Sequence, residues 1–107
     1  MMDSALEMTC LQIITNTGSA KSSYIEAIQS ARAGLFEDAE KKMEEGEESF
    51  LLAHSVHGDL IQKDASGEAV PFSLILMHAE DQMAATEMAK VMAREFITLY
   101  RKKMGLG

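Results

Sequence analysis

The sequence has little of what would break helices or lock them covalently. Its 107 residues include no tryptophan, one proline and one cysteine. Because proline is excluded from helix interiors, its scarcity favours long helices. Cys10 alone cannot form an internal disulfide, and the N-terminus has no basic region followed by an apolar signal core, so we expect a reducing, cytoplasmic setting. The longest apolar runs, such as residues 50–53, fall far short of the roughly 20 residues that span a bilayer, so we expect no membrane insertion.

Basic residues are also scarce, with 10 lysines and arginines against 17 acidic residues and a net charge of -7. This balance repels phosphate backbones and therefore argues against nucleic-acid binding. Hydrophobic residues make up 47% and charged residues 25%, which is typical of a globular protein and not of a disordered chain. The length predicts a single domain over residues 1–107, with a core small enough to favour self-association.

The sequence also contains two groups of turn residues, at 33–34 and 66–71, which divide it into three predicted helices. The first is expected to begin directly after Ser4 and to end at Arg32. The weak helix formers at 16–19 predict a kink or a close helix contact within it.

The second helix has the clearest periodicity, because its apolar positions alternate in steps of three and four, as in a heptad repeat. These positions are Phe36, Ala39, Met43, Gly46, Phe50, Ala53, His57 and Leu60. The opposite face is interpreted as a solvated surface. It carries Glu37, Lys41, Glu44, Glu45 and Glu48.

The third helix is predicted to begin at Pro71, whose missing amide suits a first turn, and to end near Lys103. It carries two neighbouring stripes that are mostly apolar, which can contact two partners, both within the bundle or one in another subunit. One stripe is Leu74, Met77, Asp81, Ala84, Met88 and Val91. The other is Ile75, His78, Gln82, Ala85, Ala89, Met92, Phe96 and Leu99. We expect Met77, Met88 and Met92 to be core residues, with Met77 or Met83 available for a docking surface.

Three polar residues interrupt these stripes within one turn: His78, Asp81 and Gln82 are at positions i, i+3 and i+4. A carboxylate buried in an apolar stripe must be protonated, paired or bound to a cation. If subunits met about an axis along this stripe, copies of Asp81 would converge and could share a divalent cation. Spacing alone leaves two other interpretations open, namely a hydrogen-bonded core histidine and an aspartate exposed at the bundle edge.

Two other possible sites have simpler interpretations. The i, i+3 pair His54 and His57 has no third ligand at a recognisable spacing, so we interpret both as packing and hydrogen-bonding residues. Cys10 has no histidine or lysine nearby in sequence to lower its pKa and is interpreted as a small core residue.

The run 73–83, preceded by 64–68, resembles the lactose/cellobiose-specific IIA component of the bacterial phosphoenolpyruvate-dependent sugar phosphotransferase system. The likeness extends over nearly the whole chain, with further family-like segments at 13–22, 33–39 and 53–55. It implies an all-α, three-helix antiparallel bundle, spectrin-repeat-like, that assembles into a homotrimer.

The resemblance also implies functional residues. His78 holds the place of the phosphoryl-accepting histidine, with its tele nitrogen as the candidate atom. Asp81 holds the place of an aspartate of which three copies surround a metal ion, commonly Mg²⁺, on the trimer axis. Gln82 and Glu80 are candidate supporting residues, although they replace the second histidine and the glutamine that the family usually has there. In the second helix His57 and Gly58 replace the usual glutamine and threonine.

The implied partners are the histidine-containing phosphocarrier protein, which donates the phosphoryl group to His78, and a cysteine of the cognate IIB component, which receives it. The membrane IIC component is an indirect partner, through which a β-linked disaccharide such as lactose, cellobiose or diacetylchitobiose is taken up. The sequence does not distinguish among these sugars, because a carrier that never touches sugar has no sugar pocket. The rival interpretation is a non-catalytic helical adaptor or oligomerisation module, in which His78 only fixes the register of the bundle.

Overall fold

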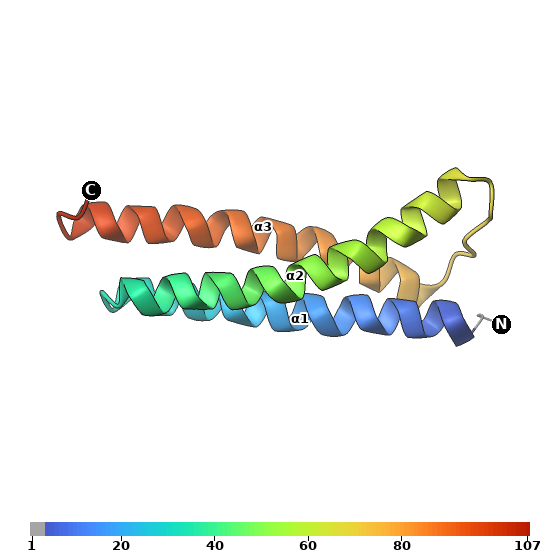
Figure 1. The fold of residues 1–107 in the computed structure, drawn as a ribbon, viewed down its shortest axis with the longest axis horizontal. Helices are drawn as coiled ribbons and strands as arrows, with labels where there is room; N and C mark the ends of the chain where they lie inside the picture. The colour runs from blue at the N-terminus through green and yellow to red at the C-terminus, as the bar shows by residue number, and fades with distance from the viewer. Residues whose placement is uncertain (1–3) are drawn as a thin grey trace.

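The structure is a computed structural model that describes residues 4–107. It consists of three helices, α1 (Ser4–Arg32), α2 (Phe36–Ala65) and α3 (Leu74–Lys103). Successive helices run in opposite directions in a rod of about 55 × 21 × 19 Å (Figure 1). The predicted all-α, three-helix antiparallel architecture is confirmed. Within the described part of the chain, no helix is both long enough and apolar enough to cross a membrane.

Helix α1 is the centre of the bundle, because it packs along both α2 and α3 while those two contact each other only weakly. The C-terminal part of α2 rises away from the other helices toward the α2–α3 loop (Figure 1). The buried face of α1 follows steps of four and three, which is a heptad pattern that keeps one stripe facing its partners. Its members are Leu6, Cys10, Ile13, Thr17, Ala20, Tyr24, Ala27 and Ala31.

The heptad pattern predicted for α2 is confirmed, since all of its members are buried except His57, which is half-buried. The acidic face opposite is exposed, as predicted. Gly46 is required within the pattern, because a Cβ there would lie 2.5 Å from Cε1 of the fully buried Tyr24 ring. The helices approach too closely at this point for any side chain at position 46.

We predicted either a kink or a close helix contact in the stretch 16–19. The structure has a close contact there, but it does not involve Gly18. Thr17 is fully buried, and its carbonyl accepts a hydrogen bond from the Thr86 hydroxyl of α3 at 3.4 Å. A Cβ on Gly18 would meet no atom within 4 Å. The two small threonines therefore set the contact between α1 and α3.

The predicted start of the third helix at Pro71 is wrong. Helix α3 begins at Leu74, and Ser73 is its N-cap, with extended backbone angles and a hydroxyl that accepts from the Leu76 amide at 3.1 Å. A serine side chain satisfies one of the free amides of the first turn, which proline cannot do. Pro71 therefore lies in the loop that precedes the cap. The predicted end at Lys103 is confirmed.

The core face of α3 also differs from the prediction. It consists of Ala79, Met83, Thr86, Ala93 and Ile97, which lie beside the two predicted stripes and not in either. Met77, Met88 and Met92 are 48%, 60% and 44% exposed, so their assignment to the core is wrong for the single chain, and Met83 is buried and not free for docking. The physical reason is that α3 contacts mainly α1, through a face of mostly small residues, and leaves the stripe that begins at Leu74 outside.

Candidate functional site

His78 lies near the N-terminal end of α3, where its side chain is exposed. The next residue, Ala79, is 1% exposed and packs into the core. Because successive helix positions are turned by about 100°, burial of Ala79 holds the His78 ring at the surface. Across residues 4–107 no hydrogen bond or ion pair engages this ring. His78 is therefore fixed in register by the bundle while both ring nitrogens remain available to a reactant.

Gln82 lies one turn further along α3 and is tied to α1. Its Oε1 accepts a hydrogen bond from Nζ of Lys21 at 3.3 Å, and both side chains are half-buried. Lysine has only donors, so the amide oxygen must face it and the NH₂ group must point elsewhere. Lys21 has no carboxylate partner among the described residues.

Glu80 points toward α2, where its two carboxylate oxygens lie 2.7 and 2.8 Å from Nε2 of His57. The His57 side chain is only 15% exposed, so the pair joins α2 to α3 where few other contacts do. The carboxylate is thus engaged by His57 and not by His78. Burial, and secondarily the charge of Glu80, raise the pKa of the Cys10 thiol in the adjacent core.

Asp81 is exposed and has no hydrogen-bonding or ionic partner among the described residues. The carboxylate is therefore not buried within one chain, although the apolar stripe had suggested burial. Its position agrees with the other interpretation, an aspartate exposed at the edge of the bundle. No group of three histidine, cysteine or acidic side chains that could hold a metal ion occurs within residues 4–107. Any ion at Asp81 needs ligands from outside the single chain.

The remaining predicted polar residues have structural roles. Cys10 is fully buried, as expected. His54 contacts the Phe50 ring with centroids 6.1 Å apart, and His57 binds Glu80, so both are packing or hydrogen-bonding residues as interpreted from the sequence. Lys21 was missed by sequence reasoning. The sequence feature that could have identified it is its position one turn after Thr17, beside the buried stripe of α1.

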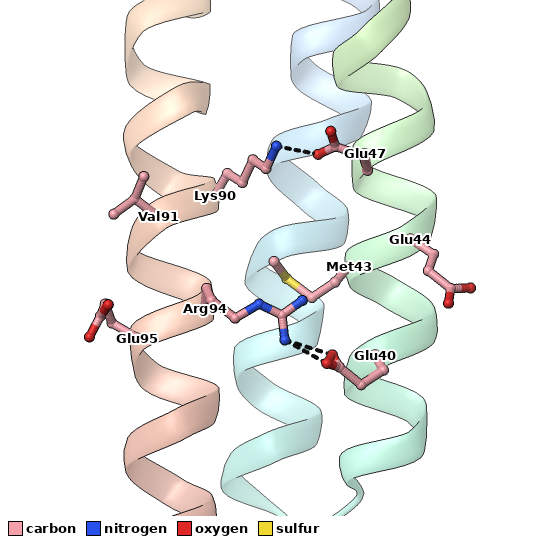
Figure 2. A pocket seen from close by; sticks show the side chains of 8 residues that line it. All are labelled: Glu40, Met43, Glu44, Glu47, Lys90, Val91, Arg94 and Glu95. Atoms are coloured by element: carbon pink, nitrogen blue, oxygen red, sulfur yellow. Dashed lines mark hydrogen bonds and ion pairs between the residues drawn. The ribbon is translucent and has the colours of Figure 1, made fainter.

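A groove with a volume of about 720 Å³ lies elsewhere, between α2 and α3. Figure 2 shows two ion pairs across it, Lys90 with Glu47 at 2.5 Å and Arg94 with Glu40 at 2.5 and 2.7 Å. Lys90 is twelve residues beyond His78, about 18 Å along the helix axis. The groove is therefore separate from the His78 site, and its ion pairs join the N-terminal half of α2 to the C-terminal half of α3.

Comparisons with known proteins agree on one family. Residues 8–101 match the family described as "PTS system, Lactose/Cellobiose specific IIA subunit". The chain is 38% identical over 101 residues to the lichenan-specific phosphotransferase enzyme IIA component of Bacillus subtilis (strain 168), covering 94% of this chain and 92% of that protein. It is 34% identical over 97 residues to the oligo-beta-mannoside-specific EIIA component of the same organism, covering 91% and 88%.

The crystal structure of the PTS cellobiose specific enzyme IIA from Bacillus anthracis is similar in fold, with a TM-score of 0.92 and 37% identity, covering 100% of this chain and 97% of that one. The sequence pattern, the relatives and the fold agree over nearly the full length. The chain therefore belongs to the lactose/cellobiose-specific IIA family, a component of the sugar phosphotransferase system.

Proposed function

We propose that this protein is a phosphoryl carrier in the cytoplasm, with His78 as the acceptor. His78 receives the phosphoryl group from the histidine-containing phosphocarrier protein and passes it to a cysteine of the cognate IIB component, during uptake of a sugar through the membrane IIC component. The observation that supports this most directly is an exposed, unengaged imidazole on a rigid helix in a chain of this family.

The chemistry needs only one nucleophilic ring nitrogen. The lone pair of a His78 nitrogen, with the tele nitrogen as candidate, forms a bond to phosphorus while the phosphorus–nitrogen bond of the donor breaks and its electron pair returns to the donor imidazole. In the second step a IIB thiolate attacks the same phosphorus, and the pair returns to His78. Neutral imidazole near pH 7 presents the required lone pair. Transfer then depends mainly on in-line positioning and charge stabilisation.

We further propose that three copies assemble along the exposed stripe of α3. Leu74, Met88 and Val91 of this stripe are 80%, 60% and 51% exposed in the single chain. A row of large apolar side chains that no helix of the same chain covers is typical of an interface. The acidic Asp81 interrupts this row, so parallel copies would bring three carboxylates together.

Asp81 fits a hard divalent cation, because carboxylate oxygens are the ligands that Mg²⁺ prefers and this carboxylate has no other partner. One copy from each subunit would hold the ion. When bound, the ion would offset repulsion among the carboxylates and stabilise the trimer, and no part of the transfer chemistry depends on it.

The acceptor is tested by incubating the protein with phosphoenolpyruvate and the general phosphotransferase proteins and measuring intact mass. We expect an acid-labile gain of one phosphoryl group that disappears in His78→Ala. His54→Ala is the matched control, because it removes another exposed histidine and must keep the gain. Absence of any gain in the wild type would refute the carrier function and favour the helical adaptor.

Our proposal for the sugar class rests on the relatives and not on this chain. The two relatives described above are named for lichenan and oligo-beta-mannosides, so we propose a β-linked disaccharide or short oligosaccharide. Transfer from phosphorylated protein to candidate IIB components tests this, since only the cognate IIB should be labelled rapidly.

A further inference from the structure

We propose that Lys21 and Gln82 form a binding site for the phosphoryl group on His78, with Lys21 as its cation. The inference rests on the proposed function of His78 and assigns to α1 a direct part in it. The geometry that carries it is the hydrogen bond of 3.3 Å between Nζ of Lys21 and Oε1 of Gln82.

Gln82 brings this pair close to His78. The two residues are four positions apart on α3, so their Cβ atoms are about 5–6 Å apart on one face of the helix. Gln82 is therefore within reach of a group carried by His78. The hydrogen bond holds Nζ of Lys21 at Gln82, one turn along α3 from His78.

The orientation of the Gln82 amide suits an anion as well. Because Lys21 can only donate, Oε1 faces Lys21 and the two N–H donors point away from it. These donors have no partner among the described residues. A phosphoryl group on His78 could thus accept from the amide while the lysine swings on its flexible stem to a second phosphoryl oxygen.

The charge around the site favours such a cation. A phosphoryl group adds close to two negative charges, and the chain already carries a net charge of -7. The neighbouring acids are Glu80, which is bound to His57, and Asp81, which has no partner. Lys21 is the cation that a hydrogen bond ties to this turn, and no carboxylate within the described residues neutralises it.

The test measures the equilibrium of phosphoryl transfer and not its rate, so that changes in docking do not affect the result. Phosphorylated donor is mixed with each variant, and the ratio of phosphorylated to free forms is read by intact mass. We expect Lys21→Gln and Lys21→Met to lower the equilibrium constant for phosphorylation of His78 about tenfold, the effect of one charge-assisted hydrogen bond. Gln82→Leu should lower it less, because Lys21 remains.

Two variants separate this role from a general charge effect. Lys21→Arg keeps the charge and should restore the equilibrium constant to within about threefold. Arg32→Gln removes a positive charge from the far end of the same helix and should leave it unchanged. Circular dichroism confirms that each variant folds.

The inference is overturned if both charge-removing variants at Lys21 match the wild type, or if Arg32→Gln lowers the constant as much as they do. Either result leaves the carrier function intact, because His78 is still phosphorylated. If the wild type is not phosphorylated at all, it is the proposed function that fails.

Discussion

Substitution of Gly46 by alanine tests the closest packing contact in the bundle. A Cβ at this position would lie 2.5, 2.8 and 3.0 Å from three ring atoms of Tyr24. The ring is fully buried and its hydroxyl is bound to Glu47 at 3.4 Å, so it has little room to move. Either α2 must shift away from α1 or the tyrosine must leave its rotamer.

The size of the effect follows from two opposing terms. Alanine in a helix interior is favoured over glycine by about 1 kcal/mol. Overpacking a core by one methyl group costs roughly 1–3 kcal/mol. We therefore expect Gly46→Ala to lower the free energy of unfolding by about 1 kcal/mol net, against a gain of about 1 kcal/mol if the space were empty.

The matched control is Gly58→Ala in the same helix, where a Cβ would meet nothing within 4 Å. Urea unfolding followed by circular dichroism, at one fixed protein concentration, gives the three stabilities. We expect the order Gly58→Ala, wild type, Gly46→Ala, from most to least stable. Truncation of the ring in Gly46→Ala/Tyr24→Leu should show a favourable coupling between the two substitutions.

A Gly46→Ala variant as stable as Gly58→Ala would refute the reasoning, because helix propensity alone would then account for both. A coupling energy of zero with Tyr24→Leu would refute the assignment of the cost to the tyrosine ring.

Three further predictions concern ionisable groups. Burial and the neighbouring Glu47 raise the pKa of Tyr24. The protonated tyrosine therefore contributes its full stability below about pH 10, the pKa in the unfolded chain, and this contribution is lost as the pH rises further. Tyr24→Phe should lose less stability than the wild type between about pH 9 and 11, and an identical loss would contradict this. Burial raises the pKa of the Cys10 thiol and also keeps the reagent away from it. Reaction with a thiol reagent should therefore be more than about 100-fold slower in the native protein than in urea, because the protein must first open locally at a cost of about 3 kcal/mol. Equal rates would disprove the burial. Asp81→Leu should remain trimeric in sedimentation equilibrium and lose the stabilisation by Mg²⁺ that we expect for the wild type; a monomer would refute the apolar stripe as the interface.

The sequence predicts a helix and its buried face well where a single pattern is present, and less well where two residues offer competing signals. The heptad pattern of α2 could be recognised because most of its apolar positions face one main partner, α1. The start of α3 was misplaced by three residues because Pro71 and Ser73 are both acceptable near a helix start, and only the hydrogen bond to Leu76 shows which one caps it.

The candidate site could be predicted only in part. His78, Asp81 and Gln82 share one turn, so their proximity follows from helix geometry alone. The contacts of Gln82 with Lys21 and of Glu80 with His57 join residues 61 and 23 positions apart. Such pairings depend on the relative rotation of packed helices, which no local pattern specifies.

The sequence by itself therefore determined the number of helices, their approximate ends, the heptad face of α2 and the family, because periodicity, turn residues and motifs are local properties of the chain. The tertiary structure decided which face of α3 enters the core. Packing on α1 selects the small residues Ala79, Thr86 and Ala93, leaves the stripe that begins at Leu74 exposed, and buries the stripe that begins at Ile75 only in part. This choice between three apolar faces depends on the shape of the neighbouring helix, and it leaves both His78 and the stripe interrupted by Asp81 at the surface.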